Sequence, residues 1–449
     1  MKEKCGIYGI YSKSFNTNNI NETINGLKLL QHRGQEGCGL VYLDILNNYV
    51  LNKGCGLVKK VFETNDFDII NSKMVIGHVR YSTSGDTKLN YNSFYEECQP
   101  LYGNCNLGSF YLAHNGNIPN LDIHDTKYII KFLENNKLST WKEKLSLLIE
   151  NIPCAYCLLI ITKNGIYALR DRFGIRPLCI GKYNDNYCIS SETCALNKFN
   201  FIKNISPGEI VEFNDFGMKS IYINKNSKLS ICSFEFIYFL NINTVCDNYI
   251  VKDIRTKLAI KLAEIEKIKY TNDYIVIGIP DTGIYYGKEY AKYLNLNYKQ
   301  YITKSKNSNR TFILPNEEER KKACLKKFNY DTINLYNKKV IILDDSIVRG
   351  NVISAIINCL WDCKVSEIHV RIPCAPVIDR CRLGIDIPNK NELLAYNRTN
   401  EEIKNKLHIN SLQYLPYIEM SNILPMYSNK ECFGETLNDE MLLKNENNL

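Results

Sequence analysis

The hydrophobic pattern changes character about halfway along the chain. The first half consists mostly of short apolar segments separated by polar turns, which is typical of antiparallel strands. Strands are predicted at residues 6–11, 39–43, 74–81, 110–113, 157–162, 165–169, 178–181 and 187–190. Helical periodicity predicts helices at 22–30 and 125–134. Many strands with few helices indicate stacked antiparallel sheets.

The second half alternates helices with short, fully apolar runs. A helical pattern at 252–268 precedes an apolar run at 274–279, and further runs follow at 340–343 and 367–372. Runs that are rich in β-branched residues and lack polar alternation are typical of strands buried on both faces. The sequence therefore predicts an α/β unit with a doubly wound parallel sheet.

The run at 340–343 is followed by a distinctive polar segment. Asp344 and Asp345 stand at its carboxyl end, a short loop carries Arg349 and Gly350, and a helical pattern begins near Ile353. In open α/β sheets such a loop is a natural phosphate site, and paired carboxylates suit sugar hydroxyls or hydrated Mg²⁺. Two adjacent aspartates also occur in solvated surface loops. The acidic pair alone therefore does not distinguish a phosphate or metal site from an ordinary loop.

Composition narrows the class of protein. A chain of 449 residues that is 45% hydrophobic and 23% charged is expected to form two or three globular domains. The net charge of +8 fits an anionic substrate, but a solvated lysine-rich surface explains it better. Because no basic run is interleaved with aromatic residues, we expect no nucleic-acid partner.

The sequence also bounds the cellular compartment. Its first residues lack an apolar secretion signal, and no apolar run approaches the ~20 residues that cross a bilayer. We therefore expect a cytoplasmic protein with no membrane partner, whose 18 cysteines are reduced thiols or metal ligands. Cys154 and Cys157 form a C-x-x-C pair, but they lie in an apolar strand without a second pair nearby, which favours core packing over zinc binding.

Seven polar strings stand out in the first half. They are Cys5-Gly6-Ile7, QHRGQEG (31–37), GHVRYSTSG (77–85), AHNGN (113–117), RDRFGIRPL (170–178), SETCAL (191–196) and PGEI (207–210). Taken singly, each is explained by glycine turns, paired buried arginines or a small core cysteine. In this order they closely resemble the glutaminase domain of class II glutamine amidotransferases, a domain with the N-terminal-nucleophile hydrolase fold.

The segment VIILDDSIVRGNV (340–352) resembles the phosphoribosylpyrophosphate (PRPP) loop of type I phosphoribosyltransferases. Its closest likeness is to the loop of glutamine PRPP amidotransferases. The two resemblances together imply stacked antiparallel sheets between helices, followed by a phosphoribosyltransferase domain. The implied domains are a propeptide (1–4), a glutaminase (5–230), a phosphoribosyltransferase (231–433) and a polar tail (434–449).

The resemblance implies the first committed step of purine synthesis. Glutamine, PRPP and water would give 5-phosphoribosylamine, glutamate and diphosphate. The family also implies purine nucleotide inhibitors and a homo-oligomer, either a tetramer or a dimer. Two alternatives stay open: a degenerate homologue that binds PRPP or nucleotides as a regulator, and a glutaminase without the transferase step.

The resemblance assigns the glutaminase residues as follows. Cys5 is the nucleophile and its own α-amino group the base, which requires removal of residues 1–4. Asn115 and Gly116 form the oxyanion hole. Arg80 holds the α-carboxylate of glutamine and Asp125 its α-ammonium, although Asp125 also suits a helix N-cap. Arg33, in the QHRG turn, is a further candidate for glutamine binding.

The resemblance also assigns a PRPP site. The loop of Asp281, Thr282 and Gly283 meets the pyrophosphate, and Asp344 and Asp345 bind the ribose hydroxyls. The 5′-phosphate is assigned to Ser346, Arg349, Gly350 and Asn351. Thr282, Asp344 and Asp345 are the candidate Mg²⁺ residues. Lys304, Arg310 and Lys327 are basic candidates around PRPP and regulatory nucleotides, in a polar segment expected to form a lid.

The sequence departs from the family at two places. Asn351 and Val352 stand where the family has two threonines beside the 5′-phosphate. One subgroup binds a 4Fe–4S cluster on four cysteines, and Cys232, Cys381 and Cys432 fall at three of those positions. Asn429 is at the fourth, and since four thiolates normally hold such a cluster, we expect that the cluster is lost.

Overall fold

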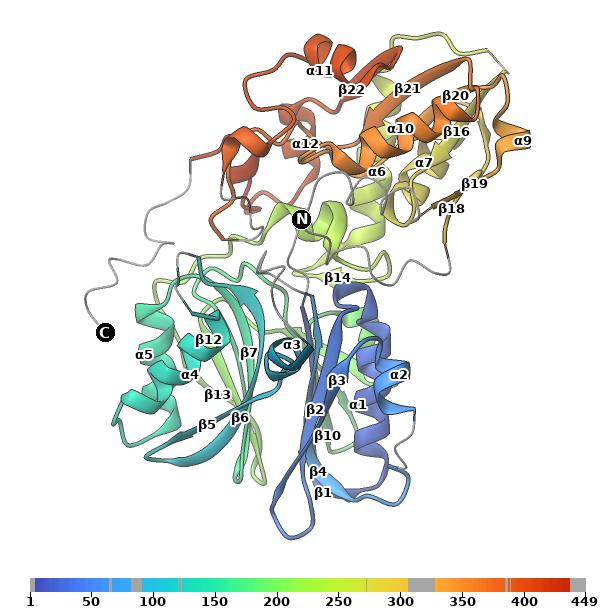
Figure 1. Ribbon diagram of the computed structural model, residues 1–449. Helices are drawn as coiled ribbons and strands as arrows, with labels where there is room; N and C mark the ends of the chain where they lie inside the picture. The colour runs from blue at the N-terminus through green and yellow to red at the C-terminus, as the bar shows by residue number, and fades with distance from the viewer. Residues whose placement is uncertain are drawn as a thin grey trace.

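The molecule has two halves stacked end to end (Figure 1), with the first half at the bottom and the second at the top. The computed structural model describes residues 5–63, 67–81, 91–119, 121, 123–271, 273–305, 328–383, 387 and 389–436. Within these residues no helix is long and apolar enough to cross a membrane.

The first half contains two antiparallel sheets that pack face to face. The seven-stranded sheet has the order β11 (Asn200–Asn204), β9 (Cys179–Tyr183), β10 (Asn186–Ser190), β1 (Gly6–Asn16), β4 (Ser72–Arg80), β2 (Gly37–Leu43) and β3 (Tyr49–Cys55). The six-stranded sheet has the order β13 (Gly217–Ile223), β12 (Glu209–Asn214), β8 (Gly165–Arg170), β7 (Ala155–Thr162), β6 (Gly108–Asn117) and β5 (Leu101–Cys105). The predicted stacked sheets are thus confirmed.

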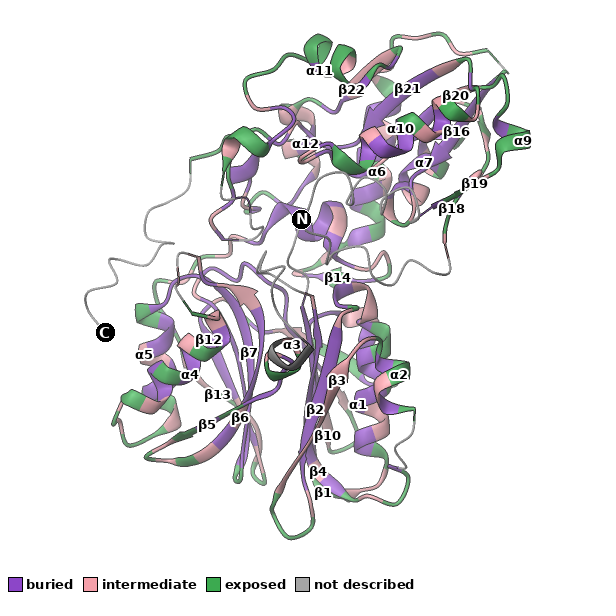
Figure 2. Ribbon diagram, viewed as in Figure 1, coloured by how far each residue is buried: buried purple, intermediate pink, exposed green. Residues whose placement is uncertain are grey.

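Helices cover the outer faces of both sheets (Figure 1). Helices α1 (Asn18–Leu29) and α2 (Val58–Phe62) lie on the seven-stranded sheet, and α4 (Asp125–Asn135) and α5 (Trp141–Asn151) lie on the six-stranded sheet. The central strands are therefore mostly buried on both faces (Figure 2), whereas the edge strands β3, β11 and β13 are partly exposed. In β1, Ile7 and Tyr11 face the other sheet, whereas Tyr8 and Ile10 pack towards α1. This alternation follows from the two-residue period of a strand.

The second half is built on a parallel sheet, as predicted. Its order is β17 (Asn297–Tyr298), β16 (Tyr274–Gly278), β20 (Lys339–Leu343), β21 (Glu367–Ile372) and β22 (Ser411–Tyr414). Its helices are α6 (Val251–Glu264), α7 (Thr282–Tyr293), α9 (Thr332–Leu335), α10 (Asn351–Asp362), α11 (Asn400–Leu407) and α12 (Tyr417–Ile423). The chain leaves β16 towards β17 on one side and continues through β20 on the other. The loops after β16 and β20 therefore flank the point where the strand order reverses, which is where such sheets bind ligands.

Short elements complete both halves. They are α3 (Tyr91–Glu96), η1 (Gln31–Arg33), η2 (Thr193–Ala195), η4 (Lys390–Glu392) and η5 (Glu431–Phe433), with the paired strands β14 (Val245–Cys246) and β15 (Tyr249–Ile250), and β18 (Ile302–Lys304) and β19 (Phe328–Tyr330).

The junction between the halves is a packed part of the core. The second half begins with a π-helical turn, η3 (Glu235–Phe239), in which Phe236, Ile237 and Phe239 are buried. One apolar cluster runs from Ile160 of the six-stranded sheet through Phe236 to Ile341 of the parallel sheet. The two halves consequently share a core, and the boundary at 230/231 stays a prediction.

Candidate functional site

Cys5 lies at the start of the central strand of the first half. The residue is 9% exposed, and its Sγ lies 3.7 Å from the carbonyl oxygen of Tyr81. Nε of Arg33 donates to the carbonyl oxygen of Cys5 at 2.9 Å. The position of the cysteine is thus fixed by β1 on one side and by a buried arginine on the other.

The predicted oxyanion pair lies on β6, and Ser191 connects it to β1. Nδ2 of Asn115 donates to Oγ of Ser191 at 3.5 Å, and the same oxygen accepts the backbone N–H of Ile7 at 3.0 Å. A Cβ atom on Gly116 would lie 2.1 Å from the carbonyl oxygen of Ala155, so only glycine fits there. The structure therefore links Asn115 to the start of β1, two residues after Cys5.

Arg33 lies in a buried ion-pair network behind Cys5. Its guanidinium pairs with Glu192 at 2.8 Å and with Glu235 at 3.0 Å, and Arg176 also pairs with Glu235 at 3.0 Å. Arg33 is fully buried, so its amino groups face protein carboxylates and not an open surface. Because Glu235 belongs to η3, the network ties Cys5 to the second half.

Arg80 and Asp125 are both close to His124. The guanidinium of Arg80, at the end of β4, sits 4.3 Å from the ring centroid of Phe94 and pairs with Glu97. Asp125 is the first residue of α4, and its side chain is 12% exposed. The N-cap of α4 is His124, so the alternative interpretation of Asp125 as an N-cap is wrong.

Histidines surround the carboxylate of Asp125. Its oxygens lie 3.7 Å from Nδ1 of His114 and 3.5 Å from Nδ1 of His124. Burial raises the pKa of this carboxyl, but the neighbouring imidazoles and the backbone N–H of Thr126 outweigh burial and hold the pKa well below its usual range. Asp125 is therefore ionised at neutral pH and suits an ammonium group.

The histidine ring of the AHNGN string is itself held in place. Nδ1 of His114 lies 3.2 Å from Oγ1 of Thr126, and its backbone N–H donates to Gln99 at 2.6 Å. Sequence reasoning missed Glu97 and His124, since neither belongs to a recognisable string. Only the structure identifies these two residues, because the fold places their segments near Arg80.

The two PRPP loops meet at the carboxyl edge of the parallel sheet. Gly278 pairs with Leu343 in register, and the N–H of Ile279 donates to the carbonyl oxygen of Leu343 at 2.8 Å. A Cβ atom on Gly283 would lie 2.4 Å from that same oxygen. The glycine of the PDTG string is therefore needed for the close approach of α7 to the loop that begins at Asp344.

The acidic pair is organised by local hydrogen bonds. Oδ1 of Asp344 accepts the backbone N–H of Asp345 at 3.0 Å, and Oγ of Ser346 donates to Oδ1 of Asp345 at 2.6 Å. Lys304 forms an ion pair with Asp281 at the same carboxyl edge of the parallel sheet. The structure thus brings the predicted residues of both loops, and Lys304, to one edge.

The loop after the acidic pair ends at the N-terminus of helix α10. Gly350 has φ +81°, a left-handed conformation that favours glycine, and it is the N-cap of α10. Asn351 is the first helical residue, so it replaces the expected threonine at a position whose backbone can still face a phosphate. Nε of Arg349 pairs with Glu392 of η4 at 2.6 Å.

Tyr238 of η3 is close to residues of both predicted sites. Burial raises the pKa of its phenol, and the charge of Asp345 and the phenol of Tyr81 raise it further. Asp345 belongs to the acidic pair, and Tyr81 follows Arg80, so η3 adjoins both predicted sites. The lid candidates Arg310 and Lys327 and the propeptide 1–4 fall outside the described residues.

The three cysteines at the predicted 4Fe–4S ligand positions lie close together at the junction between the two halves. Cys232, Cys381 and Cys432 are all buried, and the charges of the first two contribute to a raised pKa at Cys432 after burial itself. Asn429 forms a β-bridge with Cys232, and its Oδ1 accepts the backbone N–H of Glu431 at 3.2 Å.

This donor set does not fit a cluster held by four thiolates, because the fourth place holds an amide engaged with the backbone. Among the residues that the structure describes, no group of three or more His, Cys, Asp or Glu side chains is arranged to hold a metal ion.

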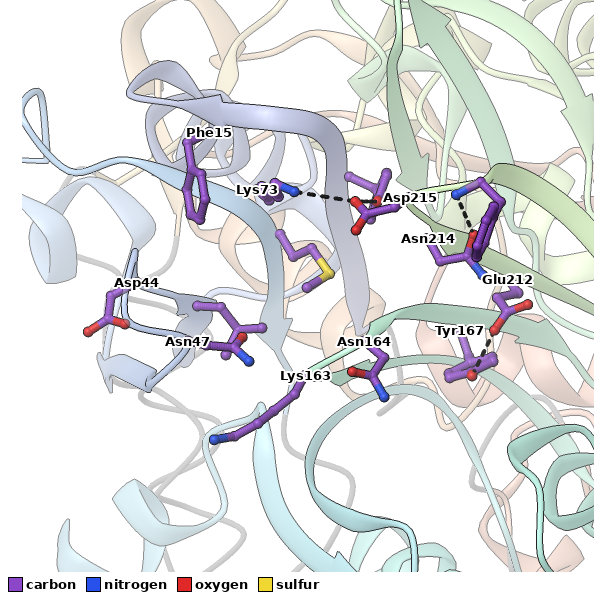
Figure 3. Close-up of a pocket in the computed structure, with 14 residues that line it drawn as sticks. Phe15, Asp44, Asn47, Lys73, Lys163, Asn164, Tyr167, Glu212, Asn214 and Asp215 are labelled. Carbon is purple, nitrogen blue, oxygen red and sulfur yellow. Dashed lines mark hydrogen bonds and ion pairs between the residues drawn. The ribbon is translucent and has the colours of Figure 1, made fainter.

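A separate hollow of about 560 Å³ lies at the far end of the first half, between the ends of the two sheets (Figure 3). Phe15, Tyr167 and the ion pair of Lys73 with Asp215, at 3.3 Å, line it. Its lining contains none of the predicted site residues.

The chain is similar to known proteins over most of its length. It is 33% identical over 445 residues to the amidophosphoribosyltransferase of Methanocaldococcus jannaschii, with 92% of each chain covered. It is 32% identical over 433 residues to that of Bacillus subtilis, with 92% of this chain and 88% of the relative covered. No family model matches the chain.

Solved structures give the same result. The glutamine PRPP amidotransferase of B. subtilis complexed with ADP and GMP superposes with a TM-score of 0.81 at 31% identity, covering 93% of this chain and 92% of that chain. A structure described as the allosteric regulatory enzyme of purine biosynthesis superposes with a TM-score of 0.83 at 30% identity, covering 96% and 95%.

Proposed function

Since the chain belongs to the amidophosphoribosyltransferase family and catalyses the first step of purine biosynthesis, we propose that its two halves divide that reaction between them. The first half releases ammonia from glutamine. The second half transfers the ammonia to PRPP and releases diphosphate. The order of the sites along the chain, on either side of η3, supports this division.

In the first half, Cys5 is the proposed nucleophile. Its thiolate attacks the side-chain amide of glutamine, and the resulting oxyanion is stabilised by Nδ2 of Asn115 and the backbone N–H of Gly116. Ammonia then leaves, and water hydrolyses the thioester to glutamate. Cys5 acts as its own base only with a free α-amino group, so residues 1–4 are removed in the active protein.

Arg80 and Asp125 bind the amino-acid head group of glutamine. The guanidinium of Arg80 matches the α-carboxylate, and the ionised carboxylate of Asp125 matches the α-ammonium. Glu97 pairs with Arg80. The substrate carboxylate would therefore displace or share that contact.

In the second half, ammonia attacks C1 of the ribose while the bond from C1 to diphosphate breaks. Asp281, Thr282 and Gly283 face the diphosphate, and the carboxylates of Asp344 and Asp345 orient the ribose hydroxyls. Ser346 and the segment 349–351 receive the 5′-phosphate through side chains and the N-terminus of α10.

The oxygens of Thr282, Asp344 and Asp345 are the type of ligand that Mg²⁺ prefers. When bound, Mg²⁺ would neutralise charge on the leaving diphosphate. The B. subtilis relative is complexed with ADP and GMP, so we extend the proposal to purine nucleotides as inhibitors of this chain, in a homo-oligomer.

The observation that carries this proposal is the pairing of two sites in one core. Ile7, two residues after Cys5, and Asn115 share the contact with Ser191, and the PDTG and DDS loops are paired through Gly278 and Leu343. A protein with only one activity would need only one of these arrangements.

The test is to measure glutamate and diphosphate release with glutamine, and diphosphate release with ammonia. Cys5→Ala should abolish the glutamine-dependent reaction and keep the ammonia-dependent one, because only the nucleophile is lost. Asp345→Asn should reduce diphosphate release with either nitrogen source. N-terminal sequencing of the active protein should begin at Cys5.

Two outcomes would contradict the proposal. Glutamate release without diphosphate, whatever the PRPP concentration, would leave a glutaminase alone. Full glutamine-dependent activity of Cys5→Ala, or of protein that retains residue 1, would exclude Cys5 with its free amine as the nucleophile.

A further inference from the structure

His124 is a buried polar group that the proposed mechanism leaves without a task. It is the N-cap residue of α4, yet its side chain makes no cap hydrogen bond. Its Nδ1 is buried and makes no hydrogen bond with the described residues, although it lies 3.5 Å from Oδ1 of Asp125. A buried imidazole nitrogen that makes no hydrogen bond is costly, and a hydrogen bond from a bound ligand would satisfy it.

We propose that His124 is a binding residue for glutamine, whose Nδ1 accepts a hydrogen bond from the substrate α-ammonium beside Asp125. The inference deepens the proposed function and rests on the assignment of Asp125 and Arg80 to the head group. An ammonium has three N–H donors, so a single carboxylate does not satisfy it in a buried pocket. Nδ1 of His124 supplies a second acceptor at the required place.

The titratable groups around His124 favour a neutral ring that accepts a hydrogen bond. It faces Asp125 on its own helix, Glu97 after α3, Arg80 at the end of β4 and His114 on β6. Burial lowers the pKa of His124 below its ordinary value, with Arg80 and His114 acting in the same direction and the two carboxylates opposing them. The imidazole is therefore neutral near pH 7, and a neutral ring with its proton on Nε2 offers Nδ1 as an acceptor.

The same geometry predicts the direction of a pH effect. On acidification His124 gains a proton, loses its acceptor and pairs with Asp125 itself. A cation then occupies the place of the substrate ammonium. The KM for glutamine should rise as the pH falls through the titration of His124, whereas the KM for ammonia should not follow it.

The experiment compares His124→Leu, which removes the acceptor, with His124→Asn, whose amide oxygen can replace Nδ1. His124→Leu should raise the KM for glutamine about tenfold with little change in kcat, since a hydrogen bond to a charged group is lost. His124→Asn should recover most of that loss. Neither variant should show the acid rise in KM that the unaltered protein shows.

Lys127→Ala, on the exposed side of the same helix, is the matched control and should leave the KM for glutamine unchanged. The ammonia-dependent reaction reports whether each variant is folded. An unchanged KM in His124→Leu would overturn the inference, as would a tenfold rise that His124→Asn shares in full.

The variant Asp125→Asn distinguishes a failure of this inference from a failure of the proposed function. If Asp125→Asn raises the KM for glutamine and His124→Leu does not, only the role of His124 is wrong. If neither variant changes the KM, the assigned glutamine site is wrong as well.

Discussion

At the scale of single residues, the clearest constraint is the space around Gly116. Gly116→Ala would place a Cβ atom 2.1 Å from the carbonyl oxygen of Ala155 and 2.6 Å from Nε2 of His114. Strand β6 must shift to relieve this overlap, which moves the N–H of residue 116 away from the oxyanion. We expect glutamine-dependent turnover to fall about 100-fold, as when an oxyanion-hole donor is lost.

The ammonia-dependent reaction is the internal control for Gly116→Ala, because it uses only the second half. A variant that kept glutamine turnover within about twofold would show that the N–H of residue 116 does not meet the oxyanion.

Residues in the recognisable strings could be predicted from the sequence, and their neighbours could not. Cys5, Asn115 and the acidic pair stand in strings whose order along the chain is informative. In the sequence, residues 82–90 lie between Arg80 and Glu97, and a further strand–helix turn precedes His124. Only the fold therefore brings Glu97 and His124 near Arg80. Arg33 was a predicted glutamine contact from its string, but its partners, Glu192 and Glu235, come from segments about 160 and 200 residues away.

At the scale of elements, helix α5 shows how a short local signal sets a boundary. Thr140 accepts the N–H of Glu143, and the side chain of Glu143 accepts the N–H of Thr140, which completes a capping box. Thr140→Ala should lower the free energy of unfolding by about 1 kcal/mol, since the backbone N–H of Glu143 at the helix N-terminus loses its side-chain partner. Urea unfolding followed by circular dichroism measures this change.

Lys142→Ala, exposed in the first turn of the same helix, is the control for Thr140→Ala and should change stability by less than about 0.5 kcal/mol. Equal effects of the two substitutions would mean that the cap contributes nothing beyond helix propensity.

Element cores were easier to predict than element ends. The apolar runs at 157–162 and 340–343 became β7 and β20 almost unchanged, because burial on both faces leaves a continuous apolar signal. Strand β3 and helix α5 were missed, since their polar residues dilute the period. Strand β1 extends to Asn16, five residues beyond the predicted end at 11, because residues 13–15 are exposed and carry no apolar alternation.

At the scale of the whole molecule, the buried ion pairs of η3 join the halves. Glu235 pairs with Arg33 and Arg176, and all three side chains are buried. Glu235→Gln would leave two guanidinium groups short of negative charge in a dry core, at a cost of about 3–5 kcal/mol. We expect a lower unfolding midpoint in urea, together with reduced glutamine turnover, because Arg33 also holds the carbonyl of Cys5.

Glu22→Gln breaks the more exposed pair with Lys198 and is the control for Glu235→Gln, with an expected change of at most about 1 kcal/mol. If the two variants had equal midpoints, the ion pairs of η3 would not be what holds the halves together.

The β-bridge between Cys232 and Asn429 has a consequence for how such a protein can be rearranged. The N–H of Ser233 donates to Asn429 at 3.1 Å, and the N–H of Asn429 donates to Ile231 at 2.7 Å, so the entry and exit of the second half are hydrogen-bonded neighbours. Adjoining ends of this kind tolerate circular permutation, because a short linker can join them. The ends of residues 231–429 thus have the geometry that a circular permutation of the second half requires.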